Sequence, residues 1–147
     1  MIMRTTNNAE YYERKQEVKL RRQDLIEPEL SYNVLGIAFR VFNDLGPGLY
    51  EKNYQQAMAI GLSGKNIKFI QQFPIKLRFL EESVGNYFAD FLVENKMILE
   101  LKTGNQINRK HARQLLAYLK STDIKLGLLV YFGSDNVFSK RIINLDS

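Results

Sequence analysis

Apolar residues recur at helical spacing in three segments of the chain. The first covers residues 31–45, where Ser31 can cap the helix and Gly46-Pro47-Gly48 ends it. A second helix is predicted over residues 50–62, and Gly64 ends it. A third is predicted over residues 108–120. Its expected buried stripe is Ala112, Leu115, Leu116 and Leu119.

Alternation of apolar and polar residues predicts strands between the second and third helices and after the third. We expect Pro74 to separate two strands, because proline cannot donate to a strand ladder, and residues 81–85 to form a turn. The short connection at residues 94–96 predicts a hairpin. The predicted strands are 67–73, 75–79, 86–93, 97–102, 126–131 and 137–143. This order predicts a mixed α/β domain with a central sheet.

Three charged residues, Asp90, Glu100 and Lys102, interrupt the apolar strands of the predicted hairpin. Charged groups are costly to bury unless they are paired or bind a metal. Glu100 and Lys102 are two residues apart, so they share one face of their strand. If the connection is three residues long, Asp90 lies opposite Glu100 and points to the same side. A register shift of one residue would instead move Asp90 to the other face.

Two adjacent carboxylates and an amine have a specific chemical use. The carboxylates repel each other, and one holds a proton at neutral pH unless a cation lies between them. Mg²⁺ suits this position, because it prefers oxygen ligands and takes one or two carboxylates together with a substrate phosphate. Lys102 could then orient an attacking water or neutralise charge that develops on phosphorus.

Composition limits the number of domains and the kinds of metal site that the chain can form. A chain of 147 residues with 45% hydrophobic content fits one globular domain. Cysteine is absent, which excludes disulfides, thiolate metal sites and a cysteine nucleophile, so any metal must bind oxygen or the single histidine, His111. The chain shows no apolar run long enough to cross a bilayer and no signal peptide, so we expect a cytoplasmic protein without a membrane partner.

Charge is distributed unevenly along the chain. Residues 1–30 hold six basic and six acidic side chains, whereas residues 31–147 hold fifteen and ten, which together give the net charge of +5. We therefore expect a charged, partly helical or mobile N-terminal extension over residues 1–30, followed by a basic folded domain over residues 31–147. A basic body suits a polyanionic partner such as nucleic acid.

Asp90, nine intervening residues and Glu100-Leu101-Lys102 resemble the Asp…(Asp/Glu)-x-Lys core of the PD-(D/E)XK nuclease superfamily. The segment GLYEKNY at residues 48–54 resembles the Gly-x-x-Glu-x-x-Tyr signature of a small prokaryotic branch, the GxxExxY family. QLLAYLK from Gln114 and LGLLVYFG from Leu126 match as well, so the resemblance covers about residues 31–143. It implies a restriction-endonuclease-like core, in which helices flank a central mixed β-sheet.

The resemblance also implies roles for individual residues. Asp90 and Glu100 match the metal-binding acids, and Lys102 matches the catalytic lysine. Glu51 corresponds to a helical acid that supports the metal, and Gln114 to a polar residue on the helix after the core. The implied activity is hydrolysis of nucleic acid, with DNA as the favoured substrate and Mg²⁺ or Mn²⁺ as cofactor. Dimerisation would suit double-strand cleavage, so a homodimer is left open.

The start of the predicted third helix carries the expected nucleic-acid contacts. Arg109, Lys110 and Arg113 form a basic cluster, and Tyr118 follows Gln114 by one turn. The alternatives are a solvated helix face for the basic cluster and packing for Tyr118. His111 is expected to be a surface residue or a phosphate contact rather than a metal ligand.

Other interpretations of the acidic residues stay open. Glu51 could simply stabilise the first turn of its helix, and Glu100 could pair with Lys102 on a solvated face. A second class of function is a nucleic-acid-binding or partner-dependent module that keeps the nuclease fold without turnover. Salt-dependent binding without metal-dependent cleavage would distinguish it.

Overall fold

A computed structural model describes residues 26–146 of the chain. The elements in this part are α2 (Pro28–Leu45), α3 (Glu51–Gly64), β1 (Phe69–Phe79), β2 (Glu82–Val93), β3 (Met97–Thr103), α4 (Arg109–Ser121), β4 (Leu126–Phe132) and β5 (Val137–Ile143). The mixed α/β order expected from the sequence is therefore confirmed. None of these helices combines the length and the apolar character that a membrane span requires.

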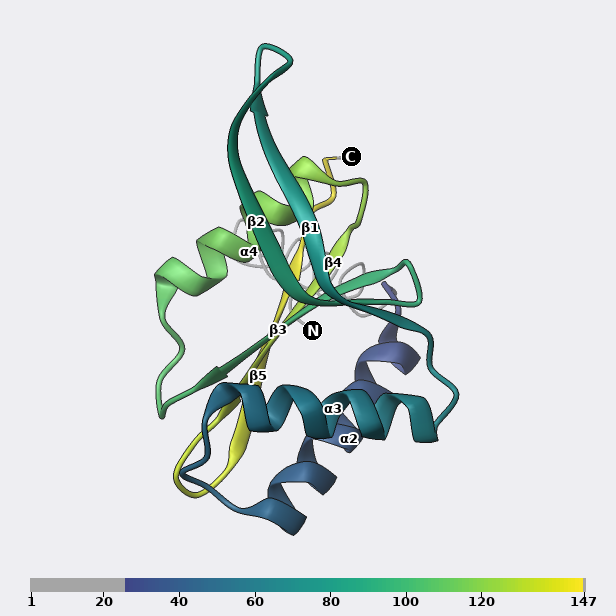
Figure 1. Ribbon diagram of the computed structural model, residues 1–147, viewed down its shortest axis with the longest axis vertical. Coiled ribbons are helices and arrows are strands. Elements are labelled where there is room, and N and C mark those ends of the chain that lie inside the picture. The colour runs from purple at the N-terminus through teal and green to yellow at the C-terminus, as the bar shows by residue number, and fades with distance from the viewer. Residues whose placement is uncertain (1–25, 147) are drawn as a thin grey trace, which may run out of the picture.

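The five strands form one mixed sheet in the order β1-β2-β3-β4-β5. Only β3 and β4 are parallel, and α4 makes the crossover between them. Helices α2 and α3 pack on one face of the sheet, and α4 packs on the other (Figure 1). The predicted architecture of a central mixed sheet flanked by helices is confirmed.

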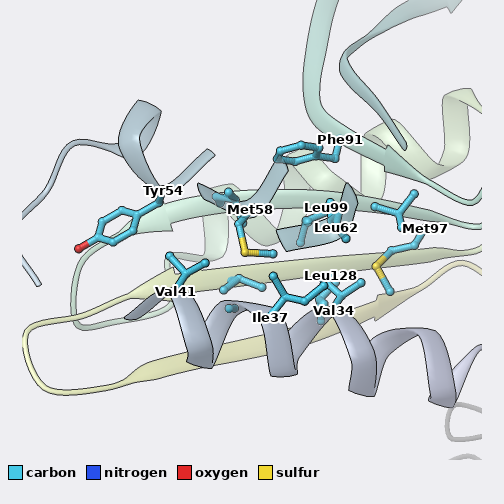
Figure 2. Packing of buried hydrophobic residues seen from close by; sticks show 14 of the residues in the cluster. Val34, Ile37, Val41, Tyr54, Met58, Leu62, Phe91, Met97, Leu99 and Leu128 are labelled. Carbon is cyan, nitrogen blue, oxygen red and sulfur yellow. The ribbon is translucent and has the colours of Figure 1, made fainter. Parts of the chain in front are cut away.

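Two apolar clusters hold these layers together. Val34 and Met58 bring α2 and α3 against alternate residues of the central strands, including Leu99 and Leu128 (Figure 2). The other face of β3 contributes Ile98 to the cluster under α4. Each fully buried aliphatic side chain contributes about 1.5–3 kcal/mol of hydrophobic free energy. The alternation along β3 therefore fixes which of its residues face α4.

Helix α2 begins earlier than the sequence indicated. It starts at Pro28, whose fixed φ suits a first helical turn, and Glu27 precedes it with a φ of 47°. The prediction that Ser31 caps this helix is wrong, because Ser31 lies inside it and its hydroxyl donates to the Glu27 carbonyl at 3.1 Å. Leu30 packs against the core, so the helix extends into the segment expected to be an extension. The rest of that expectation concerns residues 1–25, which lie outside the described residues.

Strand β1 is continuous, so the prediction that Pro74 separates two strands is wrong. Pro74 pairs with Phe88 on β2, and β1 has no second neighbour in the sheet. A proline is tolerated on such an edge strand, because its missing N–H would face away from the partner. The turn after β1 is also tighter than expected. It consists of Leu80 and Glu81, both at positive φ, which is the backbone geometry that favours a two-residue hairpin.

Strands β1 and β2 continue together beyond the rest of the sheet as a two-stranded ribbon (Figure 1). The ladder between β2 and β3 is short and ends at the pair Phe91–Leu99. The β1–β2 pairing also skips Gln72, which has a φ of 54° and lies across from Asp90. The ribbon therefore separates from β3 at Asp90, and this fork lies between α3 and α4.

Candidate active site

The fork between β2 and β3 brings Asp90 and Glu100 together. The register of the ladder places Asp90 next in line opposite Glu100, and the connection has the three residues that this requires. Asp90 Oδ2 accepts a hydrogen bond from the Leu101 N–H at 2.7 Å, while Glu100 Oε1 lies 3.4 Å from the Asp90 nitrogen. The side chain of Asp90 thus replaces the backbone acceptor that β3 loses where the strands separate.

Each of the two carboxyl groups affects the pKa of the other. Burial raises the pKa of Glu100 to about 8, and the neighbouring Asp90 carboxylate adds to that rise. Burial also raises the pKa of Asp90, although the hydrogen bonds from Leu101 and from the Glu100 side chain oppose the rise. At neutral pH, Glu100 is therefore largely protonated beside the Asp90 carboxyl group. A cation between the two groups would take the place of that proton.

Lys102 lies on the same face of β3 as Glu100 and is half-buried. Its charge lowers the pKa of both carboxyl groups, so the ammonium lies close to the pair. Within the described residues, no ion pair joins Lys102 to either carboxylate. Glu100 is only 6% exposed, which does not fit an ion pair on a solvated face. The ammonium is therefore available to an anion that enters the fork.

The segment at residues 48–54 shapes the turn between α2 and α3. Gly48 has a φ of 86°, which favours glycine. The Tyr54 hydroxyl donates to the Gly46 carbonyl at 2.7 Å and accepts from the Leu49 N–H at 3.4 Å. The Tyr54 ring is buried and stacks on Phe132 with a centroid distance of 4.1 Å. The glycine and tyrosine of this segment thus have structural contacts that fix where α3 begins.

Glu51 is the first residue of α3, but it does not join the carboxyl pair. No cluster of three acidic or histidine side chains close enough to hold a metal occurs within residues 26–146. The α3 residue that does contact the pair is Gln55, whose Nε2 donates to Asp90 Oδ1 at 3.0 Å. Sequence reasoning did not single out Gln55. Its position one helical turn after Glu51 was the available signal.

The start of α4 borders the same site through His111. Its Nδ1 lies 2.6 Å from the Tyr131 hydroxyl, and that hydroxyl also accepts the Asn108 N–H at 2.9 Å. Burial and the charge of Lys102 lower the pKa of His111, whereas Glu51 raises it. His111 therefore lies near both Lys102 and Glu51, at the rim of the fork.

Four other α4 residues that were expected at the site are exposed. Arg109, Lys110 and Arg113 are exposed in the first turns of the helix. Gln114 is exposed too, and within the described residues it makes no hydrogen bond to the carboxyl pair.

Tyr118 is 4% exposed, so its ring belongs to the core rather than to the basic surface on which a nucleic-acid contact was expected. It packs beside Tyr87, with ring centroids 5.8 Å apart. Burial, together with the charge of Glu100, raises the pKa of Tyr118 to about 12. The hydroxyl therefore stays protonated at neutral pH beside the carboxyl pair.

The donor set at the fork suits a hard divalent cation. Asp90 and Glu100 offer only oxygen atoms, which Mg²⁺ prefers, and a cation between them would replace the proton that burial favours on Glu100. Two carboxylates leave coordination positions for waters and for a phosphate oxygen. The geometry can therefore hold an ion and a phosphate next to Lys102.

Comparison with solved structures finds distant similarities. Among solved structures, the protein SSO0001 superposes with a TM-score of 0.48 at 20% identity, over 64% of this chain and 50% of SSO0001. The chain thus spans half the length of that protein. An alkaline exonuclease, LHK-Exo from Laribacter hongkongensis, superposes with a TM-score of 0.46 at 13% identity, over 74% of this chain and 77% of the exonuclease. A comparison with curated proteins gives no match.

The sequence match is the decisive comparison, because both structural similarities are distant. Residues 28–143 match the sequence model of the PD-(D/E)XK nuclease superfamily. This range includes all the described helices and strands, and the mixed five-stranded sheet with its flanking helices is the restriction-endonuclease-like fold. The chain belongs to the PD-(D/E)XK nuclease superfamily.

Proposed function

We propose that this chain hydrolyses phosphodiester bonds of nucleic acid with a divalent cation bound between Asp90 and Glu100. The observation that carries the proposal is the buried carboxyl pair at the fork, where burial raises the pKa of both groups. Members of the superfamily generally use divalent metal ions. Mg²⁺ or Mn²⁺ would supply Lewis acidity toward the phosphate and lower the pKa of a bound water.

The surrounding residues have distinct tasks in this proposal. Asp90 and Glu100 hold the cation, and the Leu101 N–H and Gln55 fix the orientation of Asp90. Lys102 stabilises the negative charge that develops on the phosphate in the transition state. Glu51 stands at the rim, near His111, where it acts on the substrate or on solvent rather than as a direct ligand.

We assign the chain to the GxxExxY branch on the segment at residues 48–54, and we propose DNA as its substrate. The exposed residues Arg109, Lys110 and Arg113 lie on the helix whose first turn borders the fork through His111. Lysine and arginine side chains in this position neutralise backbone phosphates. Their contribution to binding should therefore decrease steeply with salt.

A cleavage assay tests this function. Purified protein is incubated with single-stranded DNA, duplex DNA or RNA in Mg²⁺, in Mn²⁺ or in EDTA. We expect cleavage only with a cation, and at least about a 100-fold loss of rate in Asp90→Asn, Glu100→Gln and Lys102→Ala. Glu82→Gln and Lys120→Ala, which change exposed residues away from the fork, serve as charge-matched controls. Activity that survives all three changes at the fork would exclude the proposed centre.

A second candidate is a module that binds nucleic acid without turnover. The position of Glu51 favours it, because within residues 26–146 no third acidic side chain joins Asp90 and Glu100. Calorimetric titration with Mn²⁺ separates the two candidates. An inert scaffold should release no heat that depends on Asp90 and Glu100, whereas a nuclease should show binding that either substitution removes.

A further inference from the structure

The β1–β2 ribbon has one covered face and one bare face. Ile75 and Ala89 are buried in the cluster with Leu115 and Leu119, so α4 covers one side of the ribbon. Figure 1 shows α4 passing behind the ribbon in that view. The neighbouring residues Pro74, Lys76 and Phe88 point the other way, because side chains alternate along a strand. Within the described part of the chain, Pro74, Lys76, Asn86 and Phe88 belong to neither apolar cluster.

The bare face combines an exposed aromatic ring with positive charge. Pro74 pairs with Phe88 and Lys76 pairs with Asn86, so these four side chains project to the same side. Phe88 is 60% exposed. Lys76 is exposed as well. Toward the tip of the ribbon, the nearest acidic residues are Glu81 and Glu82.

This face leads to Asp90, whereas Glu100 lies on the side of β3 that it shares with Ile98 under α4. Phe88 precedes Asp90 by two residues on β2, which corresponds to about 6.6 Å along a strand. Gln72, on β1, donates to Gln55, the residue that contacts Asp90. A nucleotide bound against the ribbon would therefore lie next to Asp90.

We propose that the bare face of the ribbon, formed by Pro74, Lys76, Asn86 and Phe88, binds unpaired nucleotides, with a base stacked on the Phe88 ring. This inference rests on the proposed function and specifies its substrate as single-stranded nucleic acid. An exposed ring beside a lysine is the combination by which proteins bind single strands, because stacking needs the face of a base. Bases inside a duplex are already stacked on each other, so their faces are not available to the ring.

Binding to labelled oligonucleotides tests this inference without cleavage. Fluorescence anisotropy is measured in EDTA with the full chain, using 20-mer oligo(dT), oligo(rU) and a 20-base-pair DNA duplex. We expect wild type to bind a single strand more tightly than the duplex. Phe88→Ala should weaken single-strand binding about 5- to 100-fold, while Phe88→Tyr should stay within about twofold of wild type. The two single strands differ in the sugar and in the C5 methyl group of the base, so tighter binding of either one than of the duplex supports the inference.

Three further measurements make the outcome decisive. Phe79→Ala changes another exposed aromatic residue of the ribbon, at 66% exposure, and should leave binding unchanged. Phe88→Leu should bind as weakly as Phe88→Ala, because it keeps apolar surface without a stacking plane. Wild-type binding that favours duplex, or tight single-strand binding by Phe88→Ala or Phe88→Leu, would overturn the inference. Cleavage by Asp90→Asn would overturn the proposed function instead, so the two failures are distinguishable.

Discussion

The backbone N–H of Leu101 donates a hydrogen bond to Asp90 Oδ2 at 2.7 Å, at the point where β2 and β3 separate. Leu101 is fully buried, so its N–H would otherwise lack a partner. Asp90 thus has a structural contact and, in our proposal, a metal-binding role. Different substitutions of Asp90 can therefore separate the structural contact from the proposed metal binding.

The first prediction concerns stability. Asp90→Ala should lower the free energy of unfolding by about 1–3 kcal/mol, because it leaves the Leu101 N–H buried without an acceptor. Asp90→Asn keeps an oxygen at the same place and should cost less than Asp90→Ala. Urea denaturation measures both, with the exposed residue Asp135, changed to alanine, as a control. Equal stability of Asp90→Ala and wild type would show that the bond contributes nothing.

The second prediction concerns pH. The pKa of Glu100 is about 8 in the folded protein, above its value of 4.5 in an unfolded chain. Between these values the folded state binds more protons, so the free energy of unfolding of the metal-free protein should decrease as pH rises from 5 to 8. The expected decrease is a few kcal/mol, since one pKa unit corresponds to about 1.4 kcal/mol.

Glu100→Gln provides the control for this pH effect. The glutamine cannot ionise, so the free energy of unfolding of this variant should vary much less over the same range. At pH 8 the variant should be more stable than wild type. Denaturant midpoints at several pH values in EDTA give the comparison. A wild-type stability that rises toward pH 8 would contradict the predicted sign.

Alternation along the strands was enough to predict the carboxyl pair. A period of two puts Glu100 and Lys102 on one face, and a three-residue connection puts Asp90 opposite Glu100. The structure has this connection and this register. These features are local, so they can be deduced without knowledge of the tertiary contacts.

Features that depend on contacts distant in the sequence were missed. Pro74 lies within a strand because β1 has an edge position, which only the assembled sheet defines. For Tyr118 the sequence left packing and nucleic-acid contact open, and its burial follows because the ribbon folds over α4 and brings Tyr87 to it. Gln55 reaches Asp90, 35 residues away in the sequence, because α3 packs beside the fork. Helical periodicity could place Gln55 on the same side of α3 as Glu51, but it could not identify Asp90 as its partner.

The third prediction assigns a positioning role to Gln55. Gln55→Ala should lower Mn²⁺ affinity about 10- to 100-fold, because the orientation of Asp90 is no longer fixed by the bond at 3.0 Å. Stability should change little, since Gln55 lies at the surface of α3 next to the exposed Gln72. Gln56→Ala, at the neighbouring position, is the matched control. Unchanged metal affinity in Gln55→Ala would remove Gln55 from the site.

The fourth prediction separates structure from chemistry in the segment at residues 48–54. Tyr54→Phe should destabilise the protein by about 1–2 kcal/mol, because the Gly46 carbonyl and the Leu49 N–H lose their partner. It should leave metal affinity unchanged. Tyr50→Phe, at a side chain that is 77% exposed, should have little effect on either quantity. Loss of metal binding with full stability in Tyr54→Phe would instead indicate a direct role of the hydroxyl.

The most direct test of the proposed centre is a crystal of the protein soaked in Mn²⁺ and measured for anomalous scattering. We expect one peak at the fork, about 2.0–2.3 Å from an oxygen of Asp90 and from an oxygen of Glu100. The same crystal form of Glu100→Gln should lack the peak. A fork without anomalous density in the wild-type protein, or a peak bound only by other residues, would contradict the assignment of these carboxylates as a metal site.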